Sequence, residues 1–202
     1  MKLHYAWDSP YVHKVMLVAH ECGLMDQLEL LPTTVETVIE DVRGDNPLGQ
    51  IPTLITDDGT VLYDSFVIME YLDHRAGCGL LPPPGPARWL VLRHHALGHG
   101  MIDTIHLRFH EMLRPANQQS RALITKKETE ARRTFEALEA EAKSARLSPE
   151  ANLGTLTIAC ALAYAERRWS EGQWPLGRPA LAAWYEHFAA RPSMRDSAAP
   201  PE

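Results

Sequence analysis

Cysteine is scarce in this sequence, and the few cysteines present are not paired. Cys22, Cys78 and Cys160 are the only three in 202 residues, and none has the Cys-x-x-Cys spacing of redox and zinc motifs. This speaks against a disulfide framework and fits a reducing compartment. We interpret Cys22 and Cys160 as small core residues on apolar helical faces, and expect Cys78, in "AGCGLL", to be exposed. A redox role for Cys78 is the less favoured alternative.

Three other features are missing, and each excludes a class of protein. The first ten residues, "MKLHYAWDSP", lack the apolar core of a signal peptide, and no run approaches the roughly 18 apolar residues of a membrane span. These absences favour the cytoplasm and predict no membrane association. The net charge is −6 and no basic patch emerges, so we predict no nucleic-acid partner.

The first half of the chain alternates strand and helix patterns. "KLHYAW" and "LELLPT" read as strands, and between them "SPYVHKVMLVAHECGL" has apolar residues at helical spacing. "TVETVIEDVRGDNP" reads as a short helix or loop. Asp58-Gly59 between "TLIT" and "TVLYD" predicts a hairpin, which "SFVIMEYLDHRAG" follows as a helix. The predicted order is β-α-β-α-β-β-α.

The second half reads as wholly helical. Consecutive prolines in "GCGLLPPPGP" mark a linker, because they cannot continue a helix. Long helical patterns follow over residues 89–114, 118–145 and 153–169, then "PALAAWYEHFAARP", and we expect the tail "SMRDSAAPPE" to be loose. The predicted division is a first domain over 1–79, a linker over 80–87 and a helical domain over 88–202.

Four motifs carry a resemblance to a known family: "SPYVHKV", "NPLGQIPTL", "LYDSFVIMEYL" and the proline-rich linker before long helices. Each is weak alone, but their order over nearly the whole chain resembles the cytosolic glutathione transferases, of the bacterial type with serine at the thiol-activating position. The resemblance implies an α+β chain with a thioredoxin-like N-terminal domain and an all-helical C-terminal domain. It also implies glutathione as ligand and usually a homodimer.

Two segments are candidates for binding glutathione. The resemblance implies a cis bond before Pro52, which would turn the Ile51 N–H and C=O outward to pair with the cysteinyl unit, a small case of strand addition. Ser65 can cap the following helix, and its hydroxyl can join the free N–H groups of the helix N-terminus in binding a carboxylate. Asp64 can pair with the γ-glutamyl ammonium group. Gln50 stands where many relatives approach the glycyl end. The alternative is structural only: a turn proline and a helix cap.

Ser9 is the candidate for stabilising the glutathione thiolate. A free thiol has a pKa of about 8.5, so little of it is ionised at neutral pH. Because Pro10 favours the first position of a helix, the sulfur would lie near a helix N-terminus, where the Ser9 hydroxyl can donate to it. Tyr11 is a second candidate in the first turn and Tyr5 a rival hydroxyl in the strand; alternatively, Ser9 only caps the helix. Serine in place of cysteine speaks against chemistry through a protein mixed disulfide.

Histidines are unusually frequent on one face of the first long helix. His95, His99, Asp103, His106 and His110 follow helical spacing. Histidines four residues apart can ligate zinc, but no zinc-protease motif surrounds them and we predict no metal site. The resemblance implies that this helix lines the electrophile pocket and that Asp103 approaches the glutathione ammonium group of the other subunit. The alternative is a half-polar interface stripe.

One departure from the family pattern concerns a helix cap. Many relatives begin the central helix of the second domain with Ser/Thr-x-x-Asp, whereas this chain has Gly154-Thr155-Leu156-Thr157. Asn152, Gly154 or Thr155 is the candidate replacement.

Together these features predict a glutathione-dependent transferase whose thiolate attacks a hydrophobic electrophile or reduces a peroxide, typical of detoxification enzymes. The alternatives are a non-catalytic binding protein with this fold, a glutathione-dependent isomerase and a thiol-disulfide oxidoreductase.

Overall fold

The computed structural model describes residues 1–34 and 37–197. The chain divides into two compact units, one formed by Met1–Pro83 together with the segment from Pro192, the other by Pro84–Arg191. The division falls inside the predicted linker. Leu80 and Leu81, which the prediction placed in that linker, are buried.

The first unit contains a four-stranded mixed sheet with helices. Its elements are β1 (Lys2–Tyr5), α1 (Pro10–Glu21), the 3-10 turn η1 (Met25–Gln27), β2 (Glu29–Pro32), α2 (Val38–Val42), β3 (Thr53–Ile55), β4 (Val61–Leu62), α3 (Ser65–Ala76) and α8 (Pro192–Asp196). The strand order is β2-β1-β3-β4, with β1 parallel to β2 and antiparallel to β3, and with β3 antiparallel to β4. The predicted order of the first seven strands and helices is confirmed.

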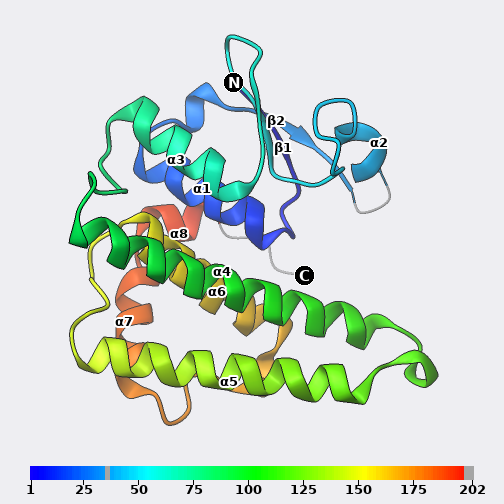
Figure 1. Cartoon of the computed structure of the whole chain (residues 1–202), viewed down its shortest axis with the longest axis vertical. Coiled ribbons are helices and arrows are strands. Elements are labelled where there is room, and N and C mark those ends of the chain that lie inside the picture. The colour runs from blue at the N-terminus through cyan, green and yellow to red at the C-terminus, as the bar shows by residue number, and fades with distance from the viewer. Residues whose placement is uncertain (35–36, 198–202) are drawn as a thin grey trace. The chain divides into compact units, whose positions relative to one another are not determined.

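The core of the first unit joins the sheet to α1 and α3. These two helices lie side by side, and α3 also contacts β3 (Figure 1). Leu3, Leu54, Leu17, Ile68 and Leu72 have no exposed surface. Because apolar residues recur at helical spacing in α1 and α3, each helix presents one continuous apolar face to this core.

The C-terminal tail differs from its prediction. It was expected to be loose, but its first residues form the short helix α8, which packs against α1. Ser193 donates a hydrogen bond to the Glu21 carboxylate, His13 Nε2 lies 3.0 Å from Ser197 Oγ, and Met194 is buried. These tertiary contacts stabilise a five-residue helix that has little stability of its own. The last five residues lie outside the described part of the chain.

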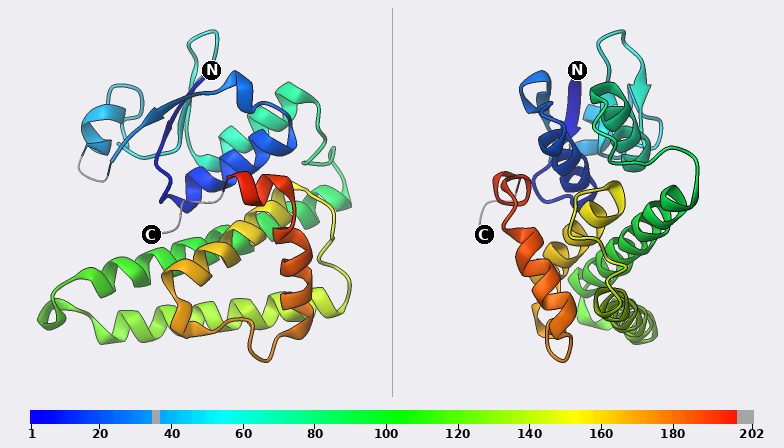
Figure 2. Two further views of the ribbon diagram at one scale, coloured as in Figure 1. Left: turned by 180° about the vertical axis from the view of Figure 1, so that it is seen from behind. Right: turned by 90° about the vertical axis from the view of Figure 1, so that its left-hand side faces the viewer.

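The second unit is helical in its described elements, as predicted. It contains α4 (Pro86–Leu113), the turn η2 (Ala116–Gln118), α5 (Arg121–Lys143), α6 (Leu153–Arg168), the turn η3 (Ser170–Gly172) and α7 (Pro179–Ala189). Pro86 opens α4 instead of lying in the linker, since the first helical turn does not need its missing N–H. Figure 2 shows α4 beside both α5 and α6. Within the described residues, no helix has the length and apolar character needed to cross a membrane.

Glycine permits the close approach of α4 and α6. A Cβ atom at Gly98 would lie 2.9 Å from the Ile158 backbone nitrogen, and one at Gly154 would lie 2.6 Å from the Val91 carbonyl oxygen. The start of α6 is capped by Asn152, whose side chain accepts from the N–H groups of Gly154 and Thr155, while the Thr155 hydroxyl accepts from the Asn152 N–H. This reciprocal box replaces the missing carboxylate, as the sequence predicted for Asn152 and Thr155.

Candidate functional site at one edge of the sheet

The sheet topology brings three predicted site segments to the same edge. Tyr5 at the end of β1 lies next to the start of β3, because His4 pairs with Thr53 in antiparallel register. β4 runs back beside β3, with Leu62 opposite Leu54, and therefore ends at that edge too. We call the segments 6–9, 50–52 and 63–65, which lie at one end of the strands and not along an outer strand, the candidate edge. Adjacent strands are about 4.8 Å apart, so this edge spans roughly 10 Å from β1 to β4, the length of an extended tripeptide.

Ser9 lies on the candidate edge as the N-cap of α1. Its hydroxyl oxygen accepts from the Val12 N–H at 3.3 Å, and Pro10 is the first residue of the helix. Ser9 is half-buried, and no described residue accepts its hydroxyl proton. The hydroxyl can therefore donate to an anion at the positive end of α1 while it continues to cap the helix.

Ile51 presents unpaired backbone groups at the same edge. The Ile51–Pro52 peptide bond is cis, as the resemblance implies, and Pro52 is buried. Within the described residues, neither the N–H nor the C=O of Ile51 has a backbone partner. An extended ligand backbone can pair with both groups.

A buried asparagine fixes the loop that carries Ile51. The Asn46 side chain donates to the Gln50 carbonyl and to Thr53 Oγ1, each at 3.0 Å, and accepts from the Leu48 N–H at 3.0 Å. Thr53 Oγ1 also donates to the Gln50 carbonyl at 2.8 Å. The sequence analysis did not select Asn46, although an Asn-Pro pair is a turn signal.

The start of α3 differs by one residue from the prediction. Ser65 was expected to be the N-cap, but the cap is Asp64, whose carboxylate accepts from the Phe66 N–H at 2.7 Å. Ser65 is instead the first helical residue, is 2% exposed, and donates its hydroxyl to the Asp64 carboxylate at 3.4 Å. Aspartate and serine are similarly good caps, so the sequence alone does not choose between adjacent positions.

The remaining predicted site residues are not all on the candidate edge. Gln50 is exposed there, and Tyr11 lies half-buried in the first turn of α1 with Lys14 Nζ 5.9 Å from its ring centre. Asp103 belongs to α4 in the second unit, where its carboxylate lies 3.8 Å from His99 Nε2. The role of Asp103 toward a partner subunit stays a prediction.

The histidine row of α4 forms ring contacts and hydrogen bonds. The rings of His95 and His99 are stacked at 5.6 Å, those of His106 and His110 meet edge to face at 4.3 Å, and His106 Nδ1 lies 3.1 Å from the Tyr164 hydroxyl. Across the described part of the chain, these histidines do not bring three potential metal ligands together.

Trp7 is an exposed aromatic residue on the candidate edge that the sequence analysis also missed. It is 45% exposed, and its ring meets that of Tyr5 edge to face at 5.5 Å. A tryptophan directly after a strand and before a helix cap is the only signal that the sequence offered.

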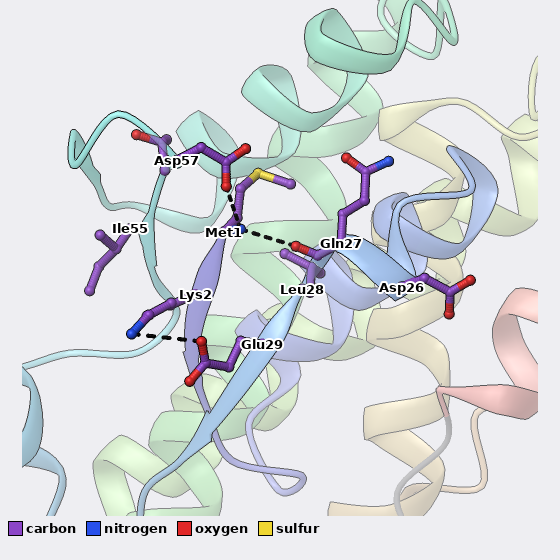
Figure 3. Close-up of a pocket in the computed structure, with 9 residues that line it drawn as sticks. Met1, Lys2, Asp26, Gln27, Leu28, Glu29, Ile55 and Asp57 are labelled. Carbon is purple, nitrogen blue, oxygen red and sulfur yellow. Dashed lines mark hydrogen bonds and ion pairs between the residues drawn. The ribbon is translucent and has the colours of Figure 1, made fainter.

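A polar pocket occupies the opposite edge of the sheet, formed by Met1, Lys2, Asp26–Glu29 and Ile55–Asp57 (Figure 3). Its charged groups pair with one another: the Met1 ammonium group lies 2.7 Å from Asp57, and Lys2 lies 3.7 Å from Glu29. Arg75 adds a second ion pair to Asp57 at 2.8 Å. The hydrogen bond from the Met1 ammonium group is the main cause that lowers the pKa of Asp57. Three ion pairs thus join residues at this end of the sheet.

Comparison with known proteins places the chain in a family. The model of the glutathione S-transferase N-terminal domain matches residues 8–75. The GST-like protein YibF of Escherichia coli K12 is 30% identical over 197 residues, which cover 96% of each chain.

Solved structures agree over the whole chain. A glutathione transferase family member from Pseudomonas fluorescens Pf-5, crystallised with bound glutathione, is 36% identical with a TM-score of 0.93 and covers 99% of both chains. A further structure from that organism, with bound S-(propanoic acid)-glutathione, is 37% identical with a TM-score of 0.90 and full coverage of both chains. The thioredoxin-like first domain and the all-helical second domain are thus confirmed, and the chain belongs to the glutathione transferase family.

Proposed function

We propose that the protein is a glutathione transferase that binds glutathione along the candidate edge and stabilises its thiolate for attack on a hydrophobic electrophile. The observation that carries the proposal is the convergence of the Ser9 hydroxyl, the free Ile51 backbone and the start of α3 on one edge. The glutathione-bound relatives support the choice of ligand.

Each part of the edge matches one part of the tripeptide. The Ile51 N–H and C=O would pair with the cysteinyl backbone in antiparallel fashion. The N-terminus of α3 would bind the γ-glutamyl carboxylate, and the Ser65 hydroxyl would turn from the Asp64 carboxylate to donate to it as well. Asp64 would bind the ammonium group on the same carbon. Gln50 would approach the glycyl end. The tripeptide sulfur would then lie toward β1, where Ser9 opens α1.

The energy required at Ser9 is modest. Lowering the thiol pKa by about 2 units corresponds to roughly 2.7 kcal/mol in favour of the thiolate. A hydrogen bond to a charged group contributes about 1.5–3 kcal/mol, and a helix N-terminus roughly 0.3–1 kcal/mol. The Ser9 hydroxyl and the α1 terminus together are sufficient. Tyr11 is the second candidate donor because it lies in the same turn.

The reaction is a nucleophilic transfer in which the glutathione sulfur forms a bond to an electrophilic carbon. A relative holds glutathione with a propanoic acid group on sulfur, which makes an S-alkylated product a reasonable expectation here. Holding both reactants in place would add to the rate. The homodimer, the cytoplasmic location and the contribution of Asp103 are further parts of this proposal.

The test compares wild type, Ser9→Ala and Ser9→Thr in the pH dependence of conjugation with an aryl halide. We expect Ser9→Ala to raise the apparent thiol pKa by about 1–2 units and to lower kcat/KM at neutral pH by roughly 10–100-fold. Ser9→Thr keeps the hydroxyl and should retain most of the activity.

Two results would contradict the proposal. An unchanged thiol pKa in Ser9→Ala removes Ser9 from this role. Glutathione binding by wild type without turnover of aryl halides, enones or peroxides favours the non-catalytic alternative.

A further inference from the structure

Two cysteines far apart in the sequence meet at the ends of α1 and α3. Cys22 is the C-cap residue of α1, and Cys78 follows Gly77, the C-cap of α3. Both sulfur atoms and one Asp73 carboxylate oxygen lie within 4.8 Å of one another. Because α1 and α3 begin at the candidate edge and this cluster lies where both end, it is separate from the proposed glutathione site.

The third member of the cluster already has a structural role. Asp73 is 6% exposed, and its two carboxylate oxygens accept from the Leu80 N–H at 2.7 Å and the Leu81 N–H at 2.9 Å. Each of its oxygens therefore accepts one hydrogen bond that holds the segment after α3. This leaves two thiols as the reactive part of the cluster, which favours thiol chemistry over metal binding.

The two thiols differ in accessibility. Cys78 is exposed, whereas Cys22 is half-buried. Burial is the main cause that raises the pKa of the Cys22 thiol, and its hydrogen bond with Cys78 adds to the effect. A reagent in solution therefore meets Cys78 first, with Cys22 held behind it as a second thiol.

The backbone around Cys78 permits the movement that a bond requires. A disulfide has sulfur atoms about 2.05 Å apart, so the two sulfurs would approach by less than about 3 Å. Gly77 and Gly79 flank Cys78 with φ of 66° and 72°, and a Cβ atom at either glycine would meet nothing within 4 Å. The space around this segment is open, while hydrogen bonds from the Cys78 and Leu80 N–H groups to Asp73 hold its backbone, so the approach would come mainly from the Cys78 side chain.

We propose that Cys22 and Cys78 are oxidised to an intramolecular disulfide by exchange with a low-molecular-weight disulfide. The Cys78 thiolate attacks one sulfur of the reagent, whose S–S bond breaks and releases one thiol. The Cys22 sulfur then loses its proton, attacks the Cys78 sulfur of the mixed disulfide and releases the second thiol. Two protein thiols are oxidised, one reagent disulfide is reduced to two thiols, and the two cysteine protons end on those thiols.

The product would link the end of α1 covalently to the segment that leads into the second unit. Removal of the negative charge on Cys78 in the mixed disulfide also removes one cause that opposes ionisation of Cys22. Burial, the larger cause, remains, so the second step depends on the closeness of the two sulfur atoms.

The experiment treats the full-length protein with bis(2-hydroxyethyl) disulfide, then alkylates it under denaturing conditions and measures the intact mass. This reagent contains no glutathione, so the result does not depend on the proposed function. We expect wild type to lose two alkylatable thiols without retaining reagent mass, and dithiothreitol to restore both. Cys22→Ser should retain one reagent half on Cys78, whereas Cys78→Ser should keep both of its thiols.

Cys160 is the internal control, since it is buried and should remain alkylatable in every sample. Retention of a stable mixed disulfide by wild type would overturn the proposal. So would the absence of reaction in Cys22→Ser, or a disulfide that links two chains on a non-reducing gel.

Discussion

The two edges of the sheet in the first unit use polar groups in opposite ways. At the edge with Met1 and Asp57, charged groups pair with one another. At the candidate edge, the Ile51 backbone and the Ser9 hydroxyl proton lack partners within the described residues. Unpaired polar groups add nothing to stability, so their presence in an ordered loop is what a ligand site requires. The comparison separates the edge whose charged groups are paired from the edge that is free to bind.

The largest effect is expected at Asn46, whose side chain fixes the loop that carries Ile51. In Asn46→Ala, the Gln50 carbonyl, Thr53 Oγ1 and the Leu48 N–H each lose a partner, and the removed side chain is itself buried. We expect a loss of about 2–4 kcal/mol in the free energy of unfolding, measured by urea denaturation, together with at least tenfold weaker glutathione binding. The matched control is Asn117→Ala, an exposed asparagine after α4. Equal stability of both variants would show that the hydrogen bonds of the Asn46 side chain are unimportant.

A pair of serine substitutions should separate ligand binding from helix capping. Ser65→Ala removes a hydroxyl proposed to bind the γ-glutamyl carboxylate, so we expect roughly 10–100-fold weaker glutathione binding by calorimetry. Ser120→Ala removes the N-cap of α5, whose hydroxyl accepts from the Leu123 N–H at 3.2 Å. It should cost about 1 kcal/mol of stability and leave glutathione binding unchanged. Similar affinities in the two variants would argue against the proposed role of Ser65.

The smallest effect is expected at the paired edge. The pKa of Asp57 is lowered in the folded protein, so its contribution to stability is present at neutral pH and is lost as pH falls below about 4. Asp57→Asn should change Tm by less than about 2 °C at pH 7, because the group is exposed. Between pH 5 and pH 3, the Tm of this variant should decrease less than that of wild type. Glutathione affinity should not change. An affinity change as large as that of Ser65→Ala would mean that the two edges are not independent.

Periodicity and turn signals were enough to predict most of the helices and strands, while the family resemblance supplied the fold. The apolar spacing in α1 and α3, the Asp58-Gly59 hairpin and the long helical patterns all identified real elements. The prediction failed at α8, because a segment of five residues carries too little pattern and is stabilised by contacts with α1 that are remote in sequence. Cys22 was predicted to be a core residue but is half-buried beside Cys78, a neighbour that is remote in sequence and that helical spacing does not reveal.

The residues of the candidate site were selected from the family resemblance together with turn and cap signals, and their role in binding stays a prediction. Strand order explains why Ser9, Ile51 and Ser65 share an edge. The shift of the α3 cap to Asp64 was not predictable, since neighbouring cap residues compete with nearly equal energies. Asn46 was missed because a sequence does not reveal that a loop asparagine points inward and bonds to three partners.

The position of α8 has a consequence for how the chain folds during synthesis. The first unit is assembled from both ends of the chain, because His13 and Ser197 meet across nearly its entire length. During synthesis, α8 therefore emerges from the ribosome only after the whole second unit. Until then, the face of α1 that α8 covers stays exposed. A fragment that ends at Pro83 would leave this face of α1 exposed, so the first unit cannot be isolated whole by a single cut.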